Sequence, residues 1–184
     1  TDVSDEALQE FLADFAIGSL VAFRGIAEGV ENSNFQLRTT EGDYILTLYE
    51  KRVNARELPW FLGLMQHLAR EGVTCPQPVA DRQGITLKTL AGRPAAITTF
   101  LPGVWPRTVR LEHCRPLGRA LAQLHAAGRS YAPERSNALG PQAWAPLLQS
   151  CAYGADAVQP CLQAELEQAF AHIVAAWPGH GQNA

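Results

Sequence analysis

Residues 43–50, with the sequence DYILTLYE, constrain the fold more than any other part of this chain. They follow a turn signal centred on Gly42, and another strand-like run, residues 34–39, precedes that turn. Two β-rich runs separated by a short glycine-containing turn predict an antiparallel hairpin. Both faces of residues 43–50 are largely apolar, since alternate side chains point to opposite sides of a strand. We therefore expect a central strand that is covered on both sides.

The spacing of apolar residues and the positions of Gly and Pro predict the other helices and strands. Ser4 can cap a first helix, whose apolar side chains recur at helical spacing from Leu8 to Phe15. Pro59 falls in the first turn of a predicted helix over residues 57–70, and Gly72 ends it. Further strands are predicted at residues 17–26, 78–81, 85–90 and 94–101, and further helices at 111–127, 142–151 and 159–177.

The order of these elements predicts an α+β chain with two parts. A small, mainly antiparallel sheet with one inserted helix occupies residues 1–101, and helices follow over residues 102–184. The dipeptide Pro102-Gly103 marks the boundary between the two parts, because this pair favours a turn or loop over a continued strand or helix.

Composition narrows the class of partner. A net charge of −3 over 184 residues provides no global basic face, so we expect no nucleic-acid partner. No apolar run reaches the roughly 20 residues that span a bilayer, and the acidic N-terminus resembles no secretory signal, so we expect a cytoplasmic protein without a membrane partner. The four cysteines form no C-x-x-C pair, which favours free thiols over a zinc site.

The segment of residues 25–34, GIAEGVENSN, has two interpretations. It can be a simple hairpin loop, in which Gly and Asn tolerate unusual backbone angles. It can also be a phosphate-covering loop, whose backbone N–H groups approach the oxygens of a nucleotide. The segment matches neither a Walker A motif nor G-x-G-x-x-G.

Several strings together resemble the bacterial homoserine kinases of the aminoglycoside-phosphotransferase superfamily, which has a protein-kinase-like fold. The strings are GVENSNF at residues 29–35, YILTLYEKR at 44–52, GRPAAI at 92–97 followed by FL at 100–101, and LG at 117–118 with LAQLH at 121–125. The resemblance covers nearly the whole chain up to about residue 130.

This resemblance implies transfer of the γ-phosphoryl group of ATP, with Mg²⁺, to the hydroxyl group of L-homoserine, a step towards threonine. Glu31, Asn32, Ser33 and Asn34 would then lie beside the phosphates. Residues 99–101 (Thr99, Phe100 and Leu101) would form a hinge whose backbone C=O and N–H groups meet the adenine edge. Ile45 would pack on the adenine face beside Thr47, and Glu57 would be the glutamate of the inserted helix.

The sequence departs from this pattern in two ways. Many kinases place a lysine on the central strand to hold phosphates, whereas Thr47 occupies the corresponding position here. Lys51, Arg52 or backbone N–H groups are then candidate donors. The chain also contains no His-x-Asp-x-x-x-x-Asn loop, which would supply the catalytic Asp and the Mg²⁺ ligands. We therefore expect the front part of a kinase, without catalytic or metal-binding residues and inactive alone.

Two alternatives stay open. The first keeps the superfamily but changes the acceptor to an aminoglycoside, choline or another small alcohol. The second is a non-catalytic nucleotide-binding module. The residues that bind the acceptor are expected in the helical part, so the sequence discriminates the acceptors by string resemblance alone.

Overall fold

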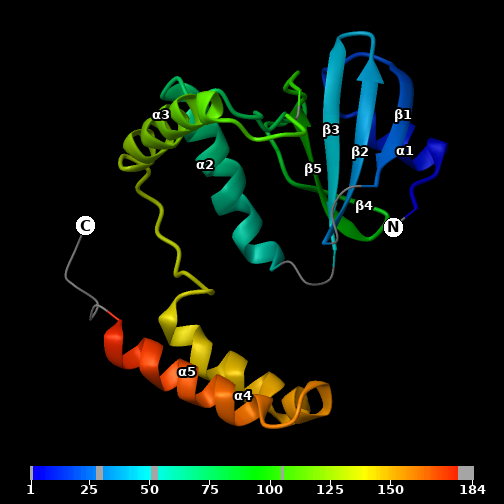
Figure 1. Ribbon diagram of the computed structural model, residues 1–184. Coiled ribbons are helices and arrows are strands. Elements are labelled where there is room, and N and C mark those ends of the chain that lie inside the picture. The colour runs from blue at the N-terminus through cyan, green and yellow to red at the C-terminus, as the bar shows by residue number, and fades with distance from the viewer. Residues whose placement is uncertain (1, 28–30, 51–53, 105, 178–184) are drawn as a thin grey trace. The chain divides into compact units, whose positions relative to one another are not determined.

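Five antiparallel strands form one sheet, in the order β1-β2-β3-β5-β4 (Figure 1). The strands are β1 (Leu20–Ile26), β2 (Asn32–Thr39), β3 (Gly42–Tyr49), β4 (Lys88–Leu90) and β5 (Arg93–Thr99). This computed structural model describes residues 2–27, 31–50, 54–104 and 106–177. The predicted hairpin is confirmed, since Thr39 pairs with Gly42 and Asn32 with Tyr49 at its two ends.

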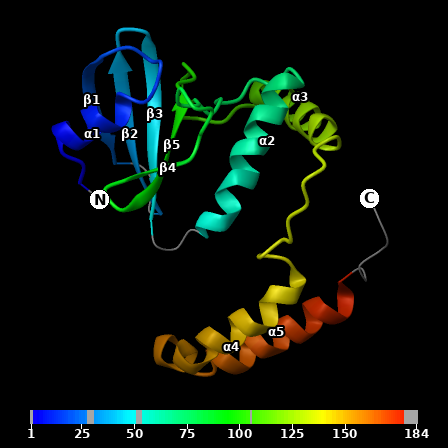
Figure 2. The same ribbon diagram turned by 180° about the vertical axis from the view of Figure 1, so that it is seen from behind.

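One face of the sheet is covered by the first helix, α1 (Asp5–Leu12), which lies in front of the strands in Figure 2. Ser4 caps this helix through a 3.2 Å hydrogen bond that its Oγ accepts from the Ala7 N–H, as the sequence predicts. Leu8 and Phe15 pack with Leu46 and Ile97 in a core that excludes water. Burial of these apolar side chains is the main force that holds α1 on the sheet.

The opposite face of β3 differs from the expectation of a strand covered on both sides. Leu46 and Leu48 are fully buried, but Ile45, Thr47 and Tyr49 on the other face are each partly exposed. The expectation was wrong because apolar character alone does not show whether a second layer covers a strand. The exposed face is the one that carries the polar residues of β2.

Predicted and observed bounds differ mainly in the short strands. The strand expected at residues 17–26 begins at Leu20, and Gly18 before it has a positive φ of 78°. Residues 78–81 contribute isolated bridges only, from Pro78 to Thr98 and from Asp81 to Phe15. Asp81 Oδ1 accepts hydrogen bonds from the Gln83 and Ile85 N–H groups in the turn that follows, which shortens the next predicted strand to β4.

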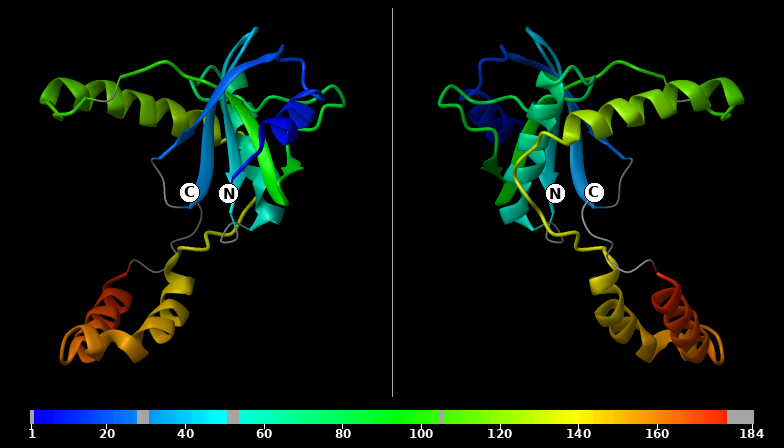
Figure 3. Two further views of the ribbon diagram at one scale, coloured as in Figure 1. Left: turned by 90° about the vertical axis from the view of Figure 1, so that its right-hand side faces the viewer. Right: turned by 90° about the vertical axis from the view of Figure 1, so that its left-hand side faces the viewer.

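The inserted helix α2 (Leu58–Arg70) is preceded by a 3₁₀ turn, η1 (Ala55–Glu57), and contacts α3 (Leu111–Gly128) (Figure 3). The segment after α3 runs antiparallel along α2. His67 Nε2 lies 2.9 Å from the carbonyl oxygen of Ala127, the Tyr131 hydroxyl donates to the Trp60 carbonyl, and Trp60 Nε1–H donates to the carbonyl of Pro133. These contacts tie residues 127–133 to the first part of the chain.

The chain divides into two units, residues 1–133 and residues 134–184. The second unit contains two helices in contact, α4 (Pro141–Val158) and α5 (Leu162–Ala176). The predicted helix at 142–151 is longer than expected, and the predicted helix at 159–177 begins three residues later. The proposed lobe boundary at Pro102-Gly103 stays a prediction. Within the described residues, none of the helices is long and apolar enough to cross a membrane.

Candidate functional site

The strand register arranges the exposed face of the sheet in rows, because directly paired residues project to the same side. One row runs across four strands through Ile26, Asn34, Thr47 and Ala96. The next row contains Arg24, Gln36, Ile45 and Thr98. We call this surface the polar sheet face. It combines amide, hydroxyl and guanidinium groups with the aliphatic side chains of Ile26, Ile45 and Ala96.

Asn34 and Thr47, two of the predicted site residues, meet at the centre of the polar sheet face. The Thr47 hydroxyl donates a 2.9 Å hydrogen bond to Asn34 Oδ1. This contact uses the oxygen of the amide, so the Asn34 Nδ2 hydrogens are directed elsewhere and can donate to a ligand oxygen. Ile45 lies one step along the same face of β3.

Asn32 and Tyr49 form the directly paired positions at the far end of the β2–β3 hairpin. The side-chain oxygen of Asn32 is buried and has no hydrogen-bond partner among the described residues. Burial also raises the pKa of the Tyr49 hydroxyl above its ordinary value, so this phenol remains protonated and able to donate at neutral pH. A buried acceptor without a partner is costly, which marks Asn32 as a position that a ligand can satisfy.

Three other predicted residues are not brought into this group. Ser33 alternates with Asn32 and Asn34, so it projects to the α1 side, where its hydroxyl donates to Glu50 Oε1 at 2.8 Å. Glu31 is exposed in a bend before β2. Glu57 ends the 3₁₀ turn before α2, and its carboxylate accepts a 2.9 Å hydrogen bond from Asn54.

The predicted hinge, residues 99–101, begins at Thr99, the last residue of β5. The Thr99 N–H donates to the carbonyl of Gln77 at 2.9 Å, and the Phe100 N–H donates to the carbonyl of Asp43 at 3.2 Å. Among the described residues, the Leu101 N–H has no backbone acceptor. Two of the three N–H groups in the predicted hinge are therefore engaged within the protein, and Leu101 offers the remaining one.

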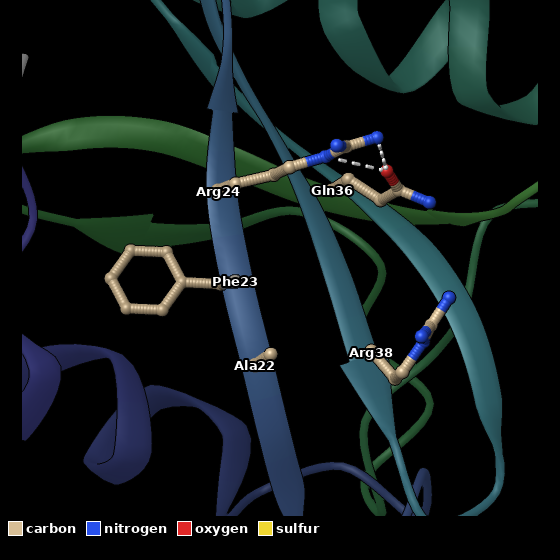
Figure 4. Close-up of a pocket in the computed structure, with 5 residues that line it drawn as sticks. All are labelled: Ala22, Phe23, Arg24, Gln36 and Arg38. Atoms are coloured by element: carbon tan, nitrogen blue, oxygen red, sulfur yellow. Dashed lines mark hydrogen bonds between the residues drawn. The ribbon is translucent and has the colours of Figure 1, made fainter.

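A pocket on the polar sheet face is lined by three residues that were not predicted from the sequence, Arg24, Gln36 and Arg38, together with Ala22 and Phe23. Figure 4 shows that Arg24, Gln36 and Arg38 extend to one side of the sheet, while Phe23 extends to the other. The sequence of β2 contains a signal for this polar face. Polar residues occupy every second position of β2, at Asn32, Asn34, Gln36 and Arg38, and such alternation is typical of a strand with one polar face.

Metal-binding geometry is absent from the part of the chain that the structure describes, since no three His, Cys, Asp or Glu side chains there are grouped to hold an ion. The polar sheet face itself carries amide, hydroxyl and guanidinium groups. Amide and guanidinium groups of this kind bind anionic oxygens without a metal.

Comparison with known proteins identifies relatives over nearly the whole chain. The homoserine kinases of Granulibacter bethesdensis and Gluconacetobacter diazotrophicus are 63% and 64% identical to it over 178 residues, and that of Acidiphilium cryptum is 62% identical over 179 residues. Each match covers 97% of this chain and 56% of the relative. The chain thus spans little more than half the length of these relatives, in agreement with the expectation of a partial kinase sequence.

Solved structures share the fold at low sequence identity. A crystal structure of spectinomycin phosphotransferase, APH(9)-Ia, in complex with ADP and spectinomycin matches with a TM-score of 0.60 and 14% identity. The match covers 95% of this chain and 56% of that one. An aminoglycoside phosphotransferase from Alicyclobacillus acidocaldarius matches with a TM-score of 0.57 and 18% identity, covering 89% of this chain and 51% of its own.

The predicted fold class, an α+β chain of the protein-kinase-like type, is confirmed by these structures. The family description "phosphotransferase enzyme family" matches residues 22–183, which include every strand and helix after α1 except the first two residues of β1. The match and the 62–64% identities agree on the same assignment. This chain is a member of the phosphotransferase enzyme family.

Proposed function

We propose that this chain forms the nucleotide-binding part of a kinase that phosphorylates the hydroxyl group of L-homoserine. The observation that carries the proposal is the 62–64% identity to three homoserine kinases across 97% of the chain. The polar sheet face supplies a surface of suitable chemistry for the nucleotide. ATP would provide the γ-phosphoryl group, and residues of this chain would bind and orient the ATP molecule.

Three groups, one after β5 and two on the sheet, have distinct roles in this proposal. The Leu101 N–H donates to the edge of the adenine base, since it is the hinge donor with no backbone acceptor among the described residues. Ile45 packs against the face of the base, and its half-buried position leaves apolar surface for that contact. The Asn34 amide, oriented by Thr47, donates to a phosphate oxygen.

Phosphoryl transfer itself needs groups that we do not assign to this chain. A base or orienting Asp must lie beside the acceptor hydroxyl, and carboxylate and amide oxygens must hold Mg²⁺. The described residues contain no grouping that fits the metal, and the His-x-Asp-x-x-x-x-Asn loop is absent from the sequence. We therefore propose that the 184-residue chain binds ATP and does not transfer its phosphoryl group alone.

A chimera tests the proposal. This chain is fused to the portion of the Gluconacetobacter diazotrophicus homoserine kinase that lies outside the 178 matched residues. We expect the chimera to phosphorylate homoserine, with no turnover of spectinomycin or choline, and the 184-residue chain to bind ATP without turnover. A chimera that folds but does not phosphorylate homoserine would overturn the proposal that this chain is the nucleotide-binding part of a homoserine kinase.

A further inference from the structure

Arg24 occupies the β1 end of the row that contains Ile45. Its Nε and Nη2 atoms both donate to Gln36 Oε1, at 3.0 and 2.7 Å (Figure 4). A guanidinium group has five N–H donors, so three of them make no hydrogen bond within the described part of the chain. The contact with Gln36 holds the group at the polar sheet face and leaves most of its donors available.

The partner of Arg24 does not neutralise its charge. Gln36 is an uncharged amide, whereas Arg38 in the same pocket pairs with the carboxylate of Asp43 at 3.0 Å. The two arginines therefore differ in the net charge that each, together with its partner, presents to an anionic ligand. Among the described residues, no carboxylate pairs with Arg24, while Asp43 cancels most of the field of Arg38 at short range.

Gln36 places this charge near the groups already assigned to the nucleotide. It is the direct cross-strand partner of Ile45, and it lies two residues along β2 from Asn34, which is paired with Thr47. Neighbouring strands are about 4.8 Å apart, so an arginine on β1 that reaches Gln36 lies over β2, beside Asn34.

We propose that Arg24 binds the phosphate groups of the nucleotide and supplies the positive charge that a lysine at the position of Thr47 would otherwise provide. This inference rests on the proposed function, because it assumes that the polar sheet face holds a nucleotide. Gln36 is a positioning residue: it orients the guanidinium before the ligand arrives. Planar donors in a fixed orientation suit phosphate oxygens better than a flexible ammonium group.

The test measures the affinity of the full 184-residue chain for adenosine, ADP and ATP by isothermal titration calorimetry. The variants are R24M, which removes the charge and keeps much of the aliphatic stem, and R38M as the matched control from the same pocket. Both side chains are exposed, so both variants are expected to fold. Thermal unfolding of each variant checks this.

We expect R24M to weaken ADP and ATP binding by about 10- to 100-fold, the range for loss of a hydrogen-bonded charged contact. Adenosine binding should be unchanged, and R38M should weaken ATP binding less than about threefold, because Asp43 already neutralises that arginine. Q36L is expected to fall between R24M and the unmodified chain, since it leaves the charge and removes its orientation.

The other possible outcomes of the titrations separate the role of Arg24 from the proposed function. If the unmodified chain binds ADP and ATP and R24M binds them equally well, the role of Arg24 is wrong while the proposed function stands. An equal loss for adenosine and ATP would place Arg24 on the base instead of the phosphates, which also overturns the inference. If the unmodified chain binds none of the three ligands, the proposed function fails, and the inference fails with it.

Discussion

The hydroxyl group of Thr47 donates a hydrogen bond to Asn34 Oδ1 across the centre of the β2–β3 hairpin, at 2.9 Å. This contact fixes the amide so that its nitrogen is the atom available to a ligand. It gives Thr47 a role that differs from that of a strand lysine: the threonine orients a neutral donor instead of carrying a charge. The relationship leads directly to a first prediction.

Replacing Thr47 by Val should weaken ATP binding by about 3- to 10-fold, the effect of one neutral hydrogen bond. Valine keeps the shape of the side chain but leaves Asn34 free to turn its oxygen towards the phosphates. Thr47→Ser retains the hydroxyl and should bind ATP nearly as well as the unmodified chain. Calorimetry with the three proteins decides: equal affinity in T47V and T47S would show that the hydrogen bond does not orient Asn34 for binding.

The second prediction concerns the contact between α2 and the segment after α3. A Cβ atom added at Gly63 would lie 2.6 Å from the Tyr131 hydroxyl oxygen, although the nearest ring carbon is 3.7 Å away. Gly63→Ala should therefore give little or no stabilisation in the unmodified chain. In a Y131F background, the same substitution should stabilise by roughly 0.5–1 kcal/mol, the intrinsic helix preference of Ala over Gly.

Urea unfolding of the four proteins in this double-mutant cycle measures the coupling between the two positions. Identical effects of G63A in both backgrounds would contradict the close approach of Tyr131 to α2. Tyr131→Phe alone should destabilise by about 1 kcal/mol, because it removes the hydrogen bond to the Trp60 carbonyl.

The third prediction concerns the turn before β1. Gly18 has a φ of +78°, and an added Cβ would lie 2.2 Å from Thr40 Oγ1 and 3.2 Å from the backbone nitrogen of Glu41. Gly72, with a φ of +82° and no atom within 4 Å of such a Cβ, provides the matched control. G72A should cost about 1–2 kcal/mol of unfolding free energy, the cost of the left-handed conformation alone.

G18A should cost about 1–3 kcal/mol more than G72A, because the new methyl group displaces the Ser19–Thr40 contact as well. The difference between the two variants isolates the effect of packing from that of backbone conformation. Chemical denaturation measures both, and equal losses would show that Thr40 and Glu41 move aside without cost.

The fourth prediction is a pH dependence centred on Asp81, whose side chain is 1% exposed. Hydrogen bonds from the Ile85 N–H, from the ammonium group of Lys88 and from the Gln83 N–H lower the pKa of the Asp81 carboxyl, although burial opposes them. A carboxyl whose pKa is lower in the folded state than in the unfolded state stabilises the fold above its unfolded pKa, about 3.9. This contribution is lost as the pH falls through the lower, folded-state value.

Asp81→Asn should therefore lower the urea midpoint at pH 7, and the difference from the unmodified chain should shrink as the pH falls below about 4. The exposed Asp2 provides a control, since D2N should have little effect at either pH. A difference between D81N and the unmodified chain that stays constant from pH 7 to pH 3 would show that ionised Asp81 does not stabilise the fold.

The sequence was sufficient to predict the α+β class, the hairpin around Gly42 and the first helix with its Ser4 cap. These features depend on local signals: alternation, a glycine turn and a capping hydroxyl. The partial exposure of Ile45 and Thr47 was not predictable, because an apolar strand face has the same sequence pattern whether or not a second layer covers it.

The candidate site was predicted only in part for a similar reason. Asn34, Ile45 and Thr47 come together through the pairing of β2 with β3. This pairing makes direct neighbours of Asn34 and Thr47, which are 13 positions apart in the sequence. Arg24 joins them only through the register of β1 against β2, which includes an irregularity between Leu20 and Ala22. A shift of one residue would turn Arg24 to the other face, so its role could not be inferred before the register was known.

The most direct test of the central claim, that the polar sheet face binds the nucleotide, is an NMR titration. The ¹⁵N-labelled 184-residue chain is titrated with a non-hydrolysable ATP analogue, and the backbone amides and the side-chain amides of Asn and Gln are followed. We expect the largest shifts at the Leu101 N–H, the Asn34 Nδ2 group and the amides of Gln36 and Ile45, with little change in α4 and α5. Saturable binding with shifts confined to α4 and α5, or no saturable shifts on the polar sheet face, would contradict the account.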